Sequence, residues 1–201
     1  MFKKIAITTN LIACLASFSL ANAADICMEV KTENTAADIS PIGQLEIADC
    51  KDIWTTLKAS HKFPGIFWQT PPKLLNLCYV SSPEGIRAKL GSKDVLVTSK
   101  SAWTSDLIPN PAGGDFLANV ISEWTIRNSI NNAVIGKIHS METLDVVNSK
   151  ELSVIISGSG KLSGAKGSIR IHSTPLEIDP LTQTVTLLEI NHLSGNLCIQ
   201  K

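Results

Sequence analysis

The sequence is poor in aromatic residues and has no excess of either charge, and both features exclude classes of protein. Aromatic residues make up 5% of the 201 residues, and tyrosine occurs once. Outer-membrane β-barrels carry girdles of aromatic side chains at both membrane interfaces, so this composition argues against such a barrel. Basic and acidic residues number 18 each, a balance that provides no field to attract nucleic acid or an anionic lipid surface. We therefore expect no nucleic-acid partner.

Long apolar runs are also scarce, and the one candidate lies at the start of the chain. No segment after residue 23 approaches the ~18 consecutive apolar residues of a membrane-spanning helix, so we expect no membrane span. Residues 1–23 combine Lys3 and Lys4, an apolar middle and the small-x-small end Ala21-Asn22-Ala23, which is typical of a signal peptide. We expect a periplasmic or secreted protein that begins at residue 24. The lipobox-like residues 11–14 leave an alternative, in which Cys14 becomes a lipid-modified N-terminus.

The cysteines show no CxxC spacing and do not cluster with histidines, which removes the usual patterns of a zinc site or a redox pair. Export to an oxidising compartment favours disulfides, so we expect two among Cys27, Cys50, Cys78 and Cys198. Four cysteines permit three pairings. We favour Cys50–Cys78, which ties a local loop, with Cys27–Cys198, which ties the two chain ends. We expect no metal and no cofactor.

Residues 24–201 have the length of a single well-buried domain. Removing the first 23 of 201 residues, which include two lysines and no acidic residue, leaves 178 residues with 16 basic and 18 acidic side chains. Residues 24–72 are the least regular, because a polar stretch and several prolines interrupt their short apolar runs. The sequence therefore predicts one domain with an irregular N-terminal part.

From residue 74 onward, short apolar runs rich in β-branched residues alternate with turn-forming residues, as in antiparallel sheets. Few stretches show a helical period, and residues 52–60 are the candidate for one or two helical turns. The sequence predicts an all-β protein. Its expected strands cover residues 26–30, 44–48, 74–80, 86–90, 95–98, 120–127, 134–143, 153–157, 168–174, 184–191 and 193–199.

The most informative stretch is residues 154–174, where two β-branched runs flank a segment with four glycines. Glycine supplies backbone conformations with positive φ and allows close chain approach, so this pattern predicts a strand, a glycine-rich corner and a second strand. The string GSGKLSG resembles a phosphate-binding loop, but it lacks the GxxxxGK[ST] spacing and is followed by a strand pattern instead of a helix. We do not expect nucleotide binding there.

Consecutive antiparallel strands in a domain of this size must protect their edges, and closure into a barrel does this most completely. We therefore expect a closed antiparallel β-barrel of about eight strands, with a two-sheet β-sandwich as the alternative.

Three segments carry a resemblance to a known family: residues 132–138 (NAVIGKI), 155–160 (IISGSG) and 162–169 (LSGAKGSI). Together they resemble barrels of the allene oxide cyclase and dirigent type, in which a strand ends in a GGTG-like turn before a GA-x-G element. The likeness covers residues 120–199 and rests on glycine positions, and the SGSG turn departs from the family's threonine-bearing one. The resemblance implies an eight-stranded barrel with a cavity for a small apolar molecule. It carries no catalytic residue over to this sequence.

Four side chains are candidates for binding a ligand inside such a barrel: Glu142, Glu189, Asn191 and Trp124. Glu142 follows an apolar inward-type pattern at period two, and Glu189 and Asn191 do so on the last strand. Polar groups on an inward face are costly unless they are partnered or functional. The pattern does not decide which face is inward, so solvated carboxylates and a core tryptophan are the alternative.

Residues 63–68 hold three aromatic side chains, Phe63, Phe67 and Trp68, between residues that break regular structure. They form either a plug over the core or an exposed patch that binds a protein partner. Three functions stay open. The one we favour is a non-enzymatic exported barrel that binds a small apolar molecule. The alternatives are an isomerase or cyclase-like enzyme with an interior carboxylate, and an envelope interaction or inhibitor module using the 63–68 loop.

Overall fold

The computed structural model describes residues 25–32, 42–65, 76–111, 116–178 and 185–200. The expected signal peptide, residues 1–23, lies outside these ranges. The described elements are strands β1 (Ile26–Lys31) and β2 (Gly43–Ile47), helix α1 (Cys50–Ala59), and strands β3 (Cys78–Ser81), β4 (Ile86–Leu90), β5 (Lys93–Trp103), β6 (Ile108–Pro109), β7 (Phe116–Asn128), β8 (Val134–Asp145), β9 (Lys150–Gly160), β10 (Lys166–Ile178) and β11 (Val185–Ile199).

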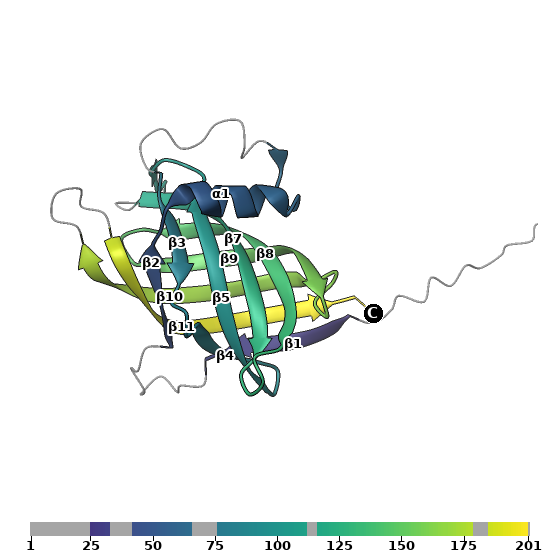
Figure 1. Cartoon of the computed structure of the whole chain (residues 1–201). Coiled ribbons are helices and arrows are strands. Elements are labelled where there is room, and N and C mark those ends of the chain that lie inside the picture. The colour runs from purple at the N-terminus through teal and green to yellow at the C-terminus, as the bar shows by residue number, and fades with distance from the viewer. Residues whose placement is uncertain (1–24, 33–41, 66–75, 112–115, 179–184, 201) are drawn as a thin grey trace, which may run out of the picture.

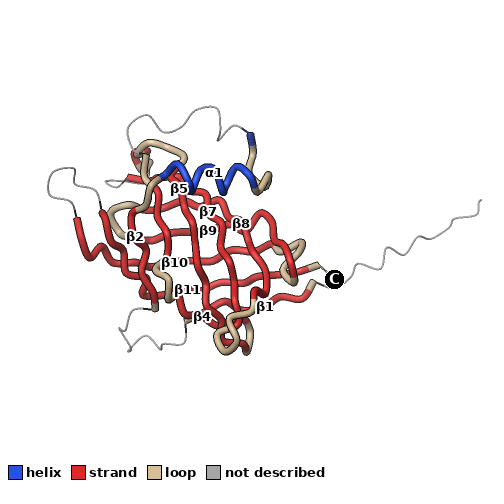
Figure 2. Tube along the Cα trace, viewed as in Figure 1, coloured by secondary structure: helices blue, strands red, loops and turns tan. Residues whose placement is uncertain are grey.

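Eight antiparallel strands close into a barrel (Figures 1 and 2). Around the ring they follow the order β5, β7, β8, β9, β10, β11, β1 and β4, and the pairing of β4 with β5 completes the circle. Strands β2 and β3 form a second link between β11 and β5. Closure gives each barrel strand a partner on both sides, which removes the exposed edges of an open sheet. The predicted all-β closed barrel is confirmed.

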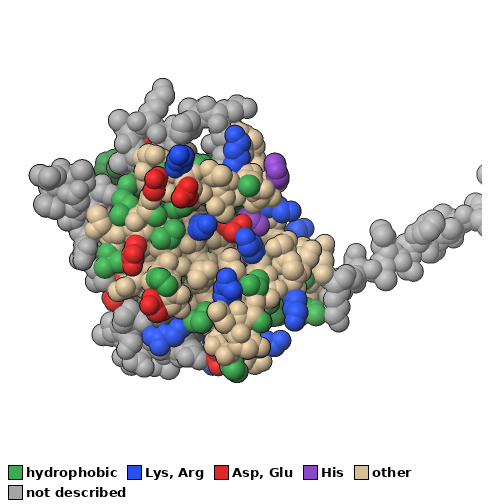
Figure 3. All heavy atoms as spheres, viewed as in Figure 1, with side chains coloured by type: hydrophobic (Ala, Val, Ile, Leu, Met, Phe, Trp, Pro, Cys, Tyr) green, Lys and Arg blue, Asp and Glu red, His purple; other side chains and the backbone are tan. Residues whose placement is uncertain are grey.

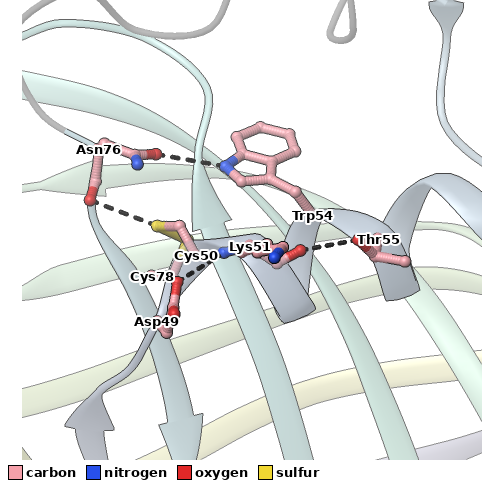
Figure 4. The surroundings of a disulfide bond; sticks show 7 residues. All are labelled: Asp49, Cys50, Lys51, Trp54, Thr55, Asn76 and Cys78. Atoms are coloured by element: carbon pink, nitrogen blue, oxygen red, sulfur yellow. Dashed lines mark hydrogen bonds between the residues drawn. A yellow bond between two sulfur atoms is a disulfide. The ribbon is translucent and has the colours of Figure 1, made fainter.

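Two disulfides tie the barrel together, and both predicted pairings are confirmed. Cys27 on β1 lies directly opposite Cys198 on β11 and is bonded to it, so this bridge joins the two ends of the described chain. Cys50 at the start of α1 is bonded to Cys78 on β3. Figure 4 shows this second bridge beside Asn76, whose side-chain oxygen accepts a hydrogen bond from Trp54 Nε1 at 3.3 Å.

Helix α1 lies across the outside of the barrel, over β5 and its neighbours (Figure 1). It begins where the Asp49 side chain accepts a hydrogen bond from the Lys51 backbone N–H at 2.9 Å, which caps the first turn. Ile53 and Leu57, four residues apart, share one helix face and are buried. They pack in a cluster that includes Cys78, Ala102 and Ile121. The helix therefore converts part of the barrel's outer face into a second core.

The glycine-rich corner between β9 and β10 closes one end of the barrel. Gly164 has a φ of 74°, a left-handed conformation that disfavours other residues. A Cβ on Gly158 would lie 1.9 Å from the Leu162 carbonyl oxygen, so the close return of the chain requires glycine there. This return places Leu162, which is 1% exposed, among the interior side chains. The predicted strand, corner and strand are confirmed.

The last strand differs from its prediction. Residues 184–191 and 193–199 are expected to be two strands, but β11 runs without a break from Val185 to Ile199. Its pairing with β10 slips by one residue, because His192 lies opposite His172 whereas Ile190 lies opposite Ser173. Asn191 is the extra residue of this β-bulge. A bulge bends a strand without ending it, which explains why the sequence pattern is interrupted there.

The barrel interior has three layers. One apolar cluster contains Trp124 and Ile138, and another, at the opposite end, contains Tyr79 and Trp103. Between them, inward-facing positions of four neighbouring strands carry polar side chains. This interior polar layer comprises Ser99 and Ser101 on β5, Ser122 on β7, Ser140 and Glu142 on β8, and Glu151 and Ser153 on β9.

Candidate functional site

Glu142 is the centre of the interior polar layer. Its Oε2 accepts a hydrogen bond from Ser122 at 2.7 Å, and its Oε1 accepts bonds from Trp124 Nε1 at 3.2 Å and Ser153 at 3.1 Å. The Ser140 hydroxyl also donates to Oε1. These donors come from β7, β8 and β9, because consecutive antiparallel strands bring their inward side chains face to face. Glu142 is 4% exposed.

Glu151 lies beside Glu142, and both carboxyl groups contact the Ser153 hydroxyl. The Ser153 hydroxyl lies 3.1 Å from Glu142 and 3.2 Å from Glu151, yet it has a single hydrogen to donate. That hydrogen can therefore go to one of the two carboxyl groups at a time. Burial, followed by the charge of Glu142, raises the pKa of Glu151 well above its usual value, which favours the neutral form of this group.

The two carboxyl groups differ in what they can do chemically. A carboxylate has about two acceptor positions on each oxygen, and Glu142 receives three donors at Oε1 and one at Oε2. Its main effect is to tie three strands together at mid-barrel. Glu151 keeps a partly accessible surface and its neutral form is favoured, so it is the group of this layer that can act as an acid.

A second polar row crosses the outer face of the same strands under α1. Glu123, His139 and Ser157 lie opposite one another on β7, β8 and β9. His139 Nε2 is 3.2 Å from Glu123 Oε2, and His139 Nδ1 is 3.1 Å from Ser157 Oγ. Lys137 Nζ donates to Glu123 Oε1 at 2.7 Å. The hydrogen bond from His139 lowers the pKa of Glu123 to about 2, with help from Lys137 and against the effect of burial.

The outer row contains the residue types of a serine hydrolase triad but not its arrangement. In those enzymes the serine contacts Nε2 of the histidine and the carboxylate contacts Nδ1, whereas here the two nitrogens are used in the reverse order. The Phe63 ring packs edge-on against His139, with ring centres 5.7 Å apart. His139 lies on the outer face of β8 between Lys137 and Met141, yet it is 3% exposed because α1 and Phe63 cover this face.

A half-open apolar pocket of about 590 Å³ lies at the end of the barrel closed by the glycine corner. Its apolar lining includes Met28 and Leu90, and Leu162 from the corner. The turns between β4 and β5, β7 and β8, and β9 and β10 all contribute to it, so we call it the mouth pocket. A cavity of this size is within the range of about 300–1,000 Å³ typical of small-molecule sites.

The structure brings two of the predicted ligand-binding residues together and separates them from the other two. Glu142 and Trp124 are bonded to each other in the interior. Glu189 and Asn191 are the neighbours of Ile190, which is 1% exposed and packs in the interior cluster. Side chains alternate along a strand, so Glu189 points to the outer face. The bulged Asn191 donates to the exposed Thr174 hydroxyl at 2.6 Å.

The predicted aromatic loop is described in part. Phe63 is 7% exposed and packs under α1, so it plugs a core as in the first of the two interpretations. Phe67 and Trp68 lie outside the described residues.

Sequence reasoning missed Glu151, the serines around Glu142 and the mouth pocket. Ser140 precedes Glu142 by two residues, Ser153 lies opposite Glu142, and Ser122 lies opposite Ser140. A pattern of polar residues shared by adjacent predicted strands is therefore the signal that could find them. The mouth pocket is formed in part by three turns that are distant in sequence, so no local sequence pattern predicts it.

Neither a protein-family model nor a curated protein sequence matches this chain. Within the described ranges, no helix has the length and hydrophobicity to cross a membrane. The same residues contain no group of three or more side chains positioned to hold a metal ion.

Proposed function

We propose that this protein is an exported β-barrel that binds a small apolar molecule in the mouth pocket, without catalysis. The observation that carries this proposal is the pocket itself: a half-open cavity of about 590 Å³ with Met28, Leu90 and Leu162 in its wall. Burial of apolar ligand surface provides the driving force, at roughly 25 cal/mol per Å² before the costs of binding. Two disulfides favour an oxidising compartment, which supports export.

We also propose the grouping with the allene oxide cyclase and dirigent type of barrel. Its support is the eight-stranded antiparallel ring, together with the glycine-rich corner between β9 and β10.

The neutral fluorophore N-phenyl-1-naphthylamine tests the binding function. We expect its fluorescence to rise saturably with the protein. Ala133 lines the mouth pocket from an exposed turn, so Ala133→Trp should weaken binding by about tenfold by filling the cavity. Thr143→Trp, on an exposed position of β8 outside the pocket, is the matched control and should bind as the wild type does. Equal binding by Ala133→Trp and the wild type would reject the mouth pocket as the site.

A second candidate function is an isomerase or cyclase-like enzyme, favoured by the acid pair of Glu142 and Glu151. In it, Glu151 as a neutral acid protonates one carbon of a ligand that enters at the barrel end opposite the mouth pocket. The Glu151 carboxylate then takes a proton from a neighbouring carbon of the same ligand, so that an isomer leaves and Glu151 is neutral again. A small molecule that co-purifies with the protein should then exchange a carbon-bound hydrogen for deuterium in D₂O. Glu151→Gln should stop the exchange. Absence of exchange with the wild-type protein rejects this candidate.

A further inference from the structure

The rim of the mouth pocket is positively charged. Among the side chains that line it, Lys93 and Lys161 are charged and none is acidic. Lys93 lies at the start of β5, and Lys161 lies in the corner between β9 and β10. Strands β5 and β9 are three steps apart in a ring of eight, so the two ammonium groups approach the pocket from well-separated sides.

These two lysines form no ion pair with any described residue, whereas the acidic side chains nearby are engaged. Asp94 is 2.9 Å from Lys89, and Glu29 is 2.6 Å from Lys31. On the face shown in Figure 3, basic side chains also gather toward the half where β1 begins and β11 ends, and acidic ones toward the other half. The charge at the mouth is therefore not neutralised locally.

The neutral part of the rim also consists mainly of donors. The side-chain oxygen of Asn128 accepts the backbone N–H groups of Ile130 and Asn131, and that of Asn131 accepts the N–H of Ala133. The remaining capacity of Asn128 is thus its NH₂ group, which donates only, whereas Asn131 keeps its NH₂ group and one acceptor position on its oxygen. A rim of ammonium and amide donors is complementary to a head group that only accepts, and an ionised carboxylate is such a group.

We propose that the mouth pocket selects a single-chain amphiphile with a carboxylate head, whose chain fills the apolar cavity while the head lies between Lys93 and Lys161. This inference rests on the proposed binding function and names its ligand class. Each lysine is exposed, so its attraction to the head is screened by water and each is worth about a two- to fivefold change in affinity.

Displacement of N-phenyl-1-naphthylamine by dodecanoate, 1-dodecanol and dodecylamine tests the proposal at low salt. The wild type should bind dodecanoate about tenfold more tightly than dodecanol, and dodecylamine most weakly. The double variant Lys93→Met/Lys161→Met should bind dodecanoate and dodecanol equally. The matched double variant Lys51→Met/Lys58→Met, on the exposed face of α1, should keep the wild-type preference.

The other outcomes distinguish failure of the carboxylate inference from failure of the binding function. Equal affinity of the wild type for dodecanoate and dodecanol overturns the carboxylate inference and leaves the apolar binding function standing. Failure of all three chains and of the fluorophore to bind overturns both. Capture of the protein on phosphatidylglycerol vesicles without competition from dodecanoate also overturns the inference, because a lipid surface is then the partner.

Discussion

At the scale of single residues, the molecule is defined by two acidic side chains, Glu142 and Glu123, that are buried among different hydrogen-bond partners. Glu142 is stabilised by four neutral donors inside the barrel, and Glu123 by a histidine and a lysine on its outer face. A buried ionised group with its partners in place is tolerated, whereas loss of the charge leaves those partners unsatisfied. Substitution at either position should therefore lower the free energy of unfolding by more than the lost hydrogen bonds contribute, because their partners stay buried and unpaired.

Glu142→Gln should destabilise the protein by about 2–3 kcal/mol, because the NH₂ group replaces one carboxylate oxygen and cannot accept the hydrogen bonds that reach that oxygen. Glu151→Gln is the isosteric control. Because burial and the charge of Glu142 raise the pKa of Glu151 and so favour its neutral form, this replacement should change the free energy of unfolding by less than about 1 kcal/mol. Urea denaturation at pH 7 measures both values. Equal destabilisation by the two variants would contradict the different roles of the two side chains.

Glu123 should make the barrel sensitive to acid. Its pKa is about 2 in the folded protein against a usual value of 4.5, so its stabilisation is complete above about pH 4.5 and is lost as the pH falls toward 2. The difference corresponds to at most about 3 kcal/mol. In Glu123→Gln, the unfolding free energy should depend less on pH between 4.5 and 2. Glu29→Gln, which removes an exposed ion pair, should retain the wild-type slope. A wild-type slope in Glu123→Gln would contradict this account.

At the scale of elements, helix α1 is not needed to close the barrel. It covers the outer face that carries Glu123, His139 and Ser157. Leu57 is fully buried between the helix and the barrel wall. The Cys50–Cys78 disulfide and the Asp49 cap fix where the helix begins. The element therefore protects Glu123 and His139 from solvent.

Leu57→Ala should cost about 2–5 kcal/mol, since it leaves a cavity under α1. Urea denaturation measures the change in the free energy of unfolding. Thr55→Ala, on the exposed helix face, should change the unfolding free energy by no more than about 0.5 kcal/mol. A small effect of Leu57→Ala would mean that the helix does not pack on the barrel in solution.

Elements with a strong local pattern could be predicted from the sequence, and those shaped by tertiary contacts could not. Strand β4 has the predicted bounds, residues 86–90, because apolar residues and turn signals define it locally. The sequence predicts two strands in place of β11, because the bulge at Asn191 breaks the alternation of apolar and polar residues along it. The sequence pattern does not decide whether Glu189 points into the barrel or to its outer face. Burial of Ile190, which depends on closure of the whole ring, decides it.

At the scale of the whole molecule, closure joins the first and last described strands, and a disulfide fixes that junction. The Cys27–Cys198 bridge spans 171 residues, and the Cys50–Cys78 bridge spans 28. A crosslink restricts the unfolded chain more when it closes a longer loop.

Replacing both cysteines of the long bridge by serine should therefore destabilise the protein more than the same change in the short bridge. Chain-entropy arguments give about 5 kcal/mol for the former and about 3.5 kcal/mol for the latter. Guanidinium denaturation of the two double variants measures the order. The reverse order would show that the junction of β1 with β11 forms independently of its crosslink.

The most direct test of the mouth pocket as the binding site is a chemical-shift titration of ¹⁵N-labelled protein with dodecanoate. The account predicts that backbone signals of Gly91, Ala133, Lys161 and Leu162, from the three turns that form the pocket, shift together and saturate. Signals of Glu142 and Ser153 in the interior layer, and of His139 under α1, should stay in place. Saturable shifts centred on those interior or outer residues, with the three turns unaffected, would contradict it.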